Sequence, residues 1–261
     1  MFVQYQIDTF TQEVFGGNPA AVVPLDSWIP DDFLQKIAQE NNLSETAFFV
    51  KEDEGYRLRW FTPTTEVDLC GHATLASAYV LFFILDYAED VLTFHTRSGP
   101  LTVKKQGTLL EMDFPALSTT STFEHIKLVE EGLGIKIVDL RKAGWDLLAL
   151  VDTEEEVRRI RPAFDIIAKL PARGLVCSAP GRQVDFVSRF FGPQVGVPED
   201  PVTGSAHTYL APYWANILGK NELIAHQVSH RPGEVLLHVV SDRVLIRGNC
   251  KIFMEGKIYL A

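Results

Sequence analysis

Short alternations of hydrophobic and polar positions run along most of the chain and are typical of half-buried β-strands. Residues 57–60 (Arg-Leu-Arg-Trp) and 101–104 (Leu-Thr-Val-Lys) show the two-residue period most clearly. Similar runs predict strands in the first half at 3–10, 20–25, 46–50, 56–61, 91–96, 101–105 and 109–114. In the second half they predict strands at 135–143, 147–151, 174–178 and 184–190, and a tail of strands from 223 to 260 with turns at 232–233, 242–243, 248–249 and 255–256.

Two apolar stretches, 72–85 and 205–218, have the length of helices and are hydrophobic on nearly all sides. Such a helix belongs inside a fold, and here we expect each to be wrapped by its own sheet. Three further stretches, beginning at Pro30, Glu124 and Glu154, have one apolar face and predict surface helices. Many strands and few helices indicate an α+β fold.

The region before each apolar helix is nearly the same sequence twice. Residues 59–63 (Arg-Trp-Phe-Thr-Pro) lead to 70–74 (Cys-Gly-His-Ala-Thr), and 189–193 (Arg-Phe-Phe-Gly-Pro) lead to 203–207 (Thr-Gly-Ser-Ala-His). Each copy is typical of a strand, a loop and the first turn of a buried helix. A duplicated unit of this kind predicts two similar domains that hold a ligand between them.

The expected domain boundary lies where Ser and Thr cluster after a strand, at 115–122. The duplication then predicts an N-terminal domain at 1–115 and a C-terminal domain at 116–249, with the last strand, 250–261, returning to complete the first. The 261 residues are enough for two modest cores.

Composition excludes several classes of function. The net charge of −10, without a basic patch, argues against nucleic acid as a partner. The longest apolar run, 75–85, is too short to span a membrane, and the chain starts with a strand-like run in place of a signal peptide. Three cysteines, far apart in sequence, favour neither a disulfide framework nor a metal site. We therefore expect a cytoplasmic protein without a metal ion.

The turns of the repeat offer a site for an anion. Gly71 and Gly204 allow close backbone approach, and a helix start presents free N–H donors to negative charge. Two such turns facing one cleft predict a small anionic substrate, such as a carboxylate. Asn18, in the turn 16–19, becomes a further donor if that turn reaches the cleft.

Three side chains are candidates for acid–base chemistry, and each also has an ordinary structural explanation. Glu45 follows a polar turn and opens an apolar strand, where desolvation raises a carboxyl pKa, although most such glutamates are solvated. His72 lies at a helix start that favours the neutral imidazole, and it equally fits a hydrogen bond within the turn. Asp200 fits a second acid–base group, a partner for His72, or an Asx turn before proline.

The two copies differ at the residue before glycine. Cys70 stands in the first copy and Thr203 in the second, so a pair of opposed cysteines, as a two-base racemase requires, is broken. Ser205 takes the place of His72 and fits either a substrate oxygen or an ordinary helix start. A Cys70–His72 thiol enzyme and a metal site formed by His72, Asp200 and His207 are weaker alternatives.

Taken together, four segments resemble the PhzF-like (phenazine-biosynthesis-like) family, whose fold is that of diaminopimelate epimerase. They lie in sequence order and extend the resemblance over essentially the whole chain. The segments are 15–22 (FGGNPAAV), 42–47 (NLSETA), 68–74 (DLCGHAT) and 199–207 (EDPVTGSAH). The resemblance implies two pseudo-symmetric domains, each a curled, barrel-like mixed sheet around a central apolar helix.

The resemblance also implies a chemistry. Glu45 matches the family's catalytic glutamate, which moves a proton between carbons of a small carboxylic acid, and His72 and Asp200 match residues that assist it. Substrate binding is implied for the turn residues Gly71, Gly204 and Ser205. We therefore expect an isomerase that uses no cofactor. The alternative function left open is a non-catalytic metabolite- or protein-binding member of the fold. Assembly as a homodimer is left open as well.

Overall fold

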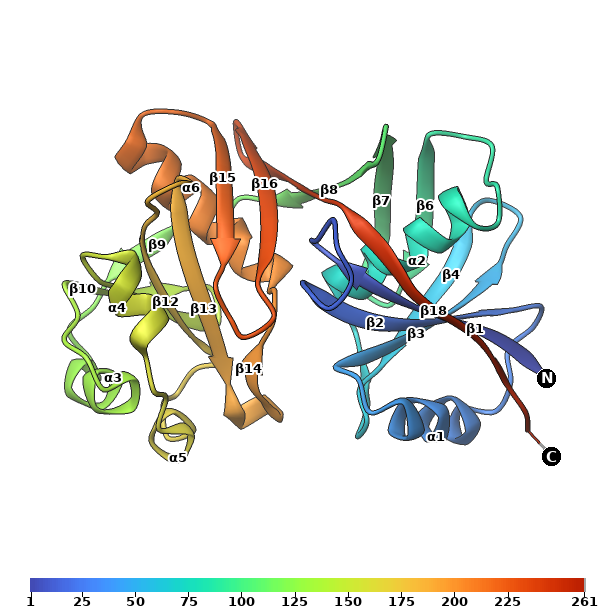
Figure 1. Ribbon diagram of the computed structural model, residues 1–261, viewed down its shortest axis with the longest axis horizontal. Helices are drawn as coiled ribbons and strands as arrows, with labels where there is room; N and C mark the ends of the chain where they lie inside the picture. Colours follow the sequence, from blue (N-terminus) through green and yellow to red (C-terminus); the bar gives the residue numbers. More distant parts are fainter. Residues whose placement is uncertain (261) are drawn as a thin grey trace. The chain divides into compact units, whose positions relative to one another are not determined.

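The computed structural model describes residues 1–260 and divides into two compact units. Unit 1 comprises Met1–Asp113 together with the segment from Arg247 onward, and unit 2 comprises Phe114–Ile246. Each unit is a curled sheet around one apolar helix, which is α2 (Gly71–Phe83) in unit 1 and α6 (His207–Leu218) in unit 2 (Figure 1). Both helices were expected from the sequence, and the α+β fold class is confirmed.

In unit 1 the strands are β1 (Phe2–Thr9), β2 (Asn18–Leu25), β3 (Glu45–Lys51), β4 (Tyr56–Phe61), β5 (Glu66–Val67), β6 (Val91–Thr96), β7 (Gly99–Gln106), β8 (Leu109–Pro115) and β18 (Cys250–Ile258). The last two residues of β8 already belong to unit 2. A surface helix, α1 (Asp31–Asn41), connects β2 to β3 and buries Leu34, Ile37 and Ala38 against the sheet. The central helix α2 contacts β1, β2 and β3, so its apolar residues are enclosed by the strands around it.

In unit 2 the strands are β9 (Thr119–Ser121), β10 (Asp139–Ala143), β11 (Asp146–Leu150), β12 (Leu175–Pro180), β13 (Phe186–Gly192), β14 (Val197–Asp200), β15 (Glu222–Gln227), β16 (Gly233–Val240) and β17 (Arg243–Gly248). The last two residues of β17 already belong to unit 1. The helices beside α6 are α3 (Ile126–Leu133), α4 (Glu154–Arg159), α5 (Phe164–Ile167) and the short 3-10 turns η1 (Pro193–Val195) and η2 (Gly204–Ala206). A capping box at Thr153 and Glu156 begins α4.

The strands of the two units pair in the same order. In unit 1, β2 runs parallel to β3, β3 antiparallel to β4, and β4 parallel to β6. In unit 2, β11 runs parallel to β12, β12 antiparallel to β13, and β13 parallel to β15. In both, a hairpin (β4–β5 or β13–β14) precedes the central helix. The duplication read from the sequence is therefore a duplication of topology.

The repeated arginine has the same structural task in both units. Arg59 forms a two-point ion pair with Glu66, and Arg189 forms one with Glu199, each through Nε at 2.7 Å and Nη2 at 2.9 Å. Both guanidinium groups also lie over the phenylalanine two residues later, with the carbon 5.1 Å from the Phe61 ring centre and 4.9 Å from that of Phe191. Each pair ties a long strand to the short strand that leads to the central helix.

Three sequence-based expectations need correction. The strand expected at 135–143 begins only at Asp139, because the left-handed Gly134 ends α3 immediately before this segment. The turn expected at 255–256 is wrong, since β18 continues through both residues and pairs them with Tyr5 and Gln4 of β1. The short elements β5, β9, β14 and α5 were missed, because two to four residues carry no readable period. In the part that the structure describes, none of the helices has the length and hydrophobicity to cross a membrane.

Candidate active site

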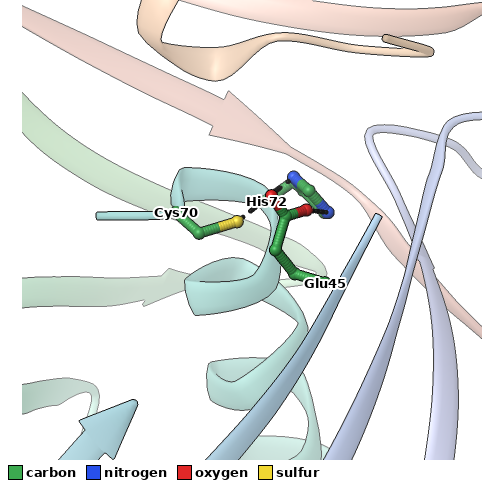
Figure 2. A group of neighbouring side chains, drawn as sticks. All are labelled: Glu45, Cys70 and His72. Atoms are coloured by element: carbon green, nitrogen blue, oxygen red, sulfur yellow. Dashed lines mark hydrogen bonds and ion pairs between the residues drawn. The ribbon is translucent and has the colours of Figure 1, made fainter. Parts of the chain in front are cut away.

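The candidate site of unit 1 lies where β3 and α2 begin. Glu45 is the first residue of β3 and pairs with Ala20 of β2, and His72 is the second residue of α2. Cys70 is the residue immediately before the helix. Figure 2 shows the three side chains turned toward one another from these two elements. The structure therefore brings together Glu45 and His72, which sequence reasoning singled out, and adds Cys70 to them.

The imidazole of His72 lies between the other two side chains. Its Nε2 is 3.2 Å from Oε2 of Glu45, and its Nδ1 is 3.5 Å from Sγ of Cys70. The side chains of His72 and Glu45 are only 7% and 15% exposed. The Nε2 and Oε2 atoms are in contact distance without the alignment of a full hydrogen bond, so a small rotation is needed before a proton passes between them.

Burial sets the charge state of this histidine. Removal from water lowers the pKa of His72 to about 3, so its imidazole is neutral at neutral pH. The contact with Glu45 therefore involves a neutral ring, although its distance alone would suit an ion pair. With the proton on Nε2, the ring has a donor on the side of Glu45, and Nδ1 on its other side accepts from the Cys70 thiol.

The same three residues supply the donor types of a zinc site, with ligand atoms within 4.8 Å of one another. Their arrangement fits a single metal ion poorly. Cys70 and Glu45 contact opposite nitrogens of the ring, and only one of these nitrogens can bind a given ion.

Gly71 and Asn18 flank this group along the chain. Gly71 is the first residue of α2, and Thr74 is the first helix residue whose N–H reaches a helical acceptor, the carbonyl of Cys70. Asn18 begins β2 as a fully buried residue, and its carbonyl accepts from Thr9 Oγ1. The parts expected of Gly71 and Asn18 in substrate binding stay predictions.

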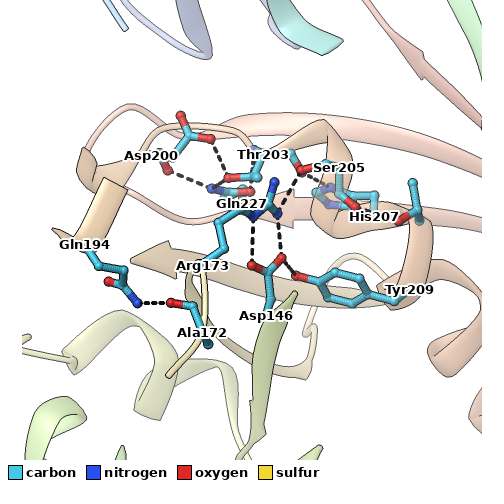
Figure 3. Close-up of polar contacts among 11 residues, drawn as sticks. Asp146, Ala172, Arg173, Gln194, Asp200, Thr203, Ser205, His207, Tyr209 and Gln227 are labelled. Atoms are coloured by element: carbon cyan, nitrogen blue, oxygen red, sulfur yellow. Dashed lines mark hydrogen bonds and ion pairs between the residues drawn. The ribbon is translucent and has the colours of Figure 1, made fainter. Parts of the chain in front are cut away.

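In unit 2, Asp200 and Thr203 belong to one polar network (Figure 3). The Thr203 hydroxyl donates to Asp200 Oδ2, and the Gln227 side chain joins the two residues. Gln227 Oε1 also accepts from the Thr203 backbone N–H at 2.9 Å. Thr203, which stands in place of the second cysteine, thus serves as a fixed hydroxyl beside Asp200. That Asp200 assists His72 stays a prediction.

Ser205 has a partner that sequence reasoning missed. Arg173 donates from Nη2 to Ser205 Oγ at 3.2 Å, and it also forms a two-point ion pair with the buried Asp146 at 2.6 and 2.9 Å (Figure 3). Tyr209 of α6 donates to the same carboxylate. The signal in the sequence is slight: Arg173 and Asp146 are charged residues that directly precede apolar strand segments.

His207 and the other two cysteines, Cys177 and Cys250, are buried. His207 is fully buried, its Nδ1 donates to the Thr203 carbonyl at 2.9 Å, and burial lowers its pKa to about 4. Cys177 lies in the core of unit 2, where burial raises its thiol pKa to about 12, and burial likewise raises the pKa of Cys250. Both thiols are therefore protonated at neutral pH and unsuited to nucleophilic chemistry.

Known proteins resemble this chain over nearly its whole length. The family model described as phenazine biosynthesis-like protein (PhzC-PhzF) matches residues 7–256. An uncharacterized isomerase of Pseudomonas aeruginosa is 52% identical over 98% of both chains. A PhzF-family crystal structure from Enterococcus faecalis is 46% identical, with a TM-score of 0.95 over 99% of both chains. A predicted epimerase from P. aeruginosa, 21% identical with full coverage of both chains, has a TM-score of 0.81 and shares the fold.

Proposed function

Because the chain belongs to the PhzC-PhzF family of phenazine biosynthesis-like proteins, we propose that it is an isomerase of a small carboxylate-bearing metabolite. The proposed reaction moves a proton from one carbon of the substrate to another without a cofactor. Relatives carry the name isomerase, and the contact between Glu45 and a neutral His72 is the observation that supports the chemistry.

In the proposed mechanism Glu45 is the base. Its carboxylate accepts the proton of an acidic C–H next to an unsaturated or carbonyl group, and the electron pair of that bond moves into the substrate as a dienolate or enolate. The carboxylic acid so formed gives a proton to a different carbon, so that no external acid or base is consumed. A single, partly buried carboxyl group suits both steps, and exchange of its proton with water between them would carry solvent deuterium into the substrate.

His72 acts on Glu45 and on developing negative charge. As a neutral ring with a proton on Nε2, it donates toward the carboxylate while that group is ionised, and it can accept in the other tautomer once Glu45 is protonated. The N–H groups at the start of α2 are donors for substrate oxygens. We assign the corresponding turn of unit 2, with Gly204, Ser205 and Asp200, to substrate binding and to assistance of the proton transfer.

Solvent exchange tests the proposal. The protein is incubated in deuterium oxide with a panel of small unsaturated and hydroxylated carboxylic acids, and proton NMR follows loss of carbon-bound hydrogen. We expect exchange or isomerisation of at least one acid, and its loss in Glu45→Gln. Acids that bind, shown by a shift in melting temperature, yet never exchange would instead support a non-catalytic binding protein.

A further inference from the structure

The two units place different chemistry at equivalent positions. Phe48 pairs with Arg59 in unit 1 as Cys177 pairs with Arg189 in unit 2. Counting back from these pairs, Gly174 occupies the place of Glu45, and Arg173 directly precedes it. Ser205 occupies the place of His72 in the repeat. Unit 1 therefore presents a carboxylate against a histidine, whereas unit 2 presents a guanidinium group against a hydroxyl.

Arg173 is held by contacts that fix one edge of its guanidinium group. Nε and Nη2 donate to both oxygens of Asp146, whose side chain is 2% exposed. The guanidinium carbon lies 5.4 Å from the ring centre of Phe190. Gly174 makes room for that ring, since a Cβ at this position would lie only 2.3 Å from Phe190 Cζ. An arginine fixed in this way loses little conformational entropy when it binds a ligand.

The other edge of the Arg173 guanidinium group, at Nη1, is available to a ligand. Among residues 1–260, Nη1 of Arg173 has no hydrogen-bond partner, and the side chain is 34% exposed. Ser205 accepts from Nη2 through its oxygen, which leaves the hydroxyl hydrogen able to donate. Nη1 and Ser205 thus supply an N–H and an O–H donor next to one another.

We infer that Arg173 and Ser205 form the anchor for the substrate's carboxylate group. This inference rests on the proposed function and adds Arg173 to it as a binding residue. Because Asp146 neutralises the arginine, recognition depends on directed, charge-assisted hydrogen bonds and not on net positive charge. That arrangement favours a planar carboxylate, whereas a net positive charge would attract any anion.

Binding without turnover tests the anchor separately from the chemistry. Malonate is titrated into the isotopically labelled protein at constant ionic strength, set with chloride, and NMR follows the Arg173 Nε–H and the Ser205 backbone N–H. We expect both signals to shift and saturate in the wild type and equally in Glu45→Gln. Arg173→Lys keeps a charge for Asp146 but loses the fork, and it should weaken malonate binding at least tenfold. Ser205→Ala should weaken it severalfold.

Tyr209→Phe is the matched control, since it removes a hydrogen bond to Asp146 while leaving Arg173 and Ser205 in place. Its malonate affinity should stay within twofold of the wild type even if its melting temperature falls. Wild-type affinity in a folded Arg173→Lys variant, or shifts confined to other residues, would overturn the inference. So would tighter binding of inorganic phosphate than of malonate. Normal malonate binding by a protein that exchanges no substrate would leave the anchor standing and refute only the isomerase.

Discussion

Nε2 of His72 lies 3.2 Å from Oε2 of Glu45, and the histidine is the less exposed of the two. Because burial keeps the ring neutral, the pair holds one negative charge, which Glu45 carries when it is ionised. A base with a neutral neighbour keeps more of its proton affinity than a base paired with a cation. In the proposed mechanism, this ionised state of Glu45 is the one that accepts a proton from carbon.

Replacement of Glu45 by glutamine should preserve the shape of the site and remove its proton acceptor. We expect the exchange rate to fall by about 10²–10⁴-fold while ligand affinity changes little. Glu40→Gln, at an exposed position on α1, is the matched control and should retain full activity. A Glu45→Gln variant with wild-type exchange would move the base to another residue.

Cys70 should matter much less than Glu45. Its thiol lies 3.5 Å from His72 Nδ1, a long hydrogen bond, and Thr203 in the second copy offers no opposing thiol. Cys70→Ala should therefore lower the exchange rate by less than about tenfold, the loss of a weak hydrogen bond that orients the ring. Complete inactivation of Cys70→Ala, with Glu45→Gln still active, would identify the thiol as the base.

The sequence predicted those parts of the site that lie in contiguous motifs, and it did not predict those that meet only through strand pairing. Glu45 and His72 belong to contiguous motifs, and the repeat marked both helix starts, so their elements were foreseeable. Arg173 and Asp146 are 27 positions apart and meet only through the parallel pairing of β11 with β12. No periodic pattern encodes that register, so their ion pair and the link to Ser205 could not be read from the sequence.

The secondary structure shows the same contrast between elements with a pattern of their own and elements that depend on a distant partner. The central helices and most strands follow from hydrophobic period, because their burial is continuous over many residues. The pairing of Glu66 with Arg59 needed the two-residue strand β5, which is too short to leave a pattern. The strand β18 crosses Glu255 and Gly256, where a turn was expected, because β1 supplies partners for its backbone.

Acid should destabilise the protein through its buried histidines. The pKa of folded His72 is about 3, below the 6.5 of an ordinary histidine, so the unfolded chain takes up the proton first as pH falls. Stability should therefore decrease from pH 6.5 toward 3, by roughly 2–3 kcal/mol for His72 between pH 6.5 and 4.5. His207, at about 4, acts in the same direction.

Urea denaturation of the wild type and of His72→Gln, each at pH 7 and 4.5, measures this effect. The variant lacks the titrating ring, so its stability should fall less over the same interval, and the two proteins should approach one another at low pH. Parallel losses in both would show that His72 is not held neutral by the fold.

The repeated ion pair of unit 2 should be important for stability. The side chains of Arg189 and Glu199 are 10% and 16% exposed, and Nη1 of the arginine also donates to the carbonyls of Val157 and Ile160. Arg189→Met leaves these acceptors and a largely buried carboxylate without a cation, at a cost of about 3–5 kcal/mol in the free energy of unfolding. Lys36→Met breaks the exposed pair with Asp32 and should cost less than about 1 kcal/mol. Equal losses in chemical denaturation would contradict this assignment.

Replacement of Gly71 by alanine should impair ligand binding without destabilising the fold. A Cβ at this position would lie 3.8 Å from Met112 Cε, an ordinary contact, and the backbone φ there is not in the left-handed region. Gly71→Ala should therefore fold with a free energy of unfolding equal to or slightly above that of the wild type, since alanine favours a helix more than glycine does. If the substrate approaches the backbone at the start of α2, the added methyl group should nevertheless raise KM or weaken ligand binding by about tenfold or more, for which a loss of roughly 1.4 kcal/mol suffices.

Gly174→Ala is the contrasting variant, because its methyl group meets the Phe190 ring and should destabilise the fold by about 1–3 kcal/mol. Denaturation curves and ligand titrations of both variants check the distinction, and a Gly71→Ala protein with unchanged affinity would remove this turn from the substrate site.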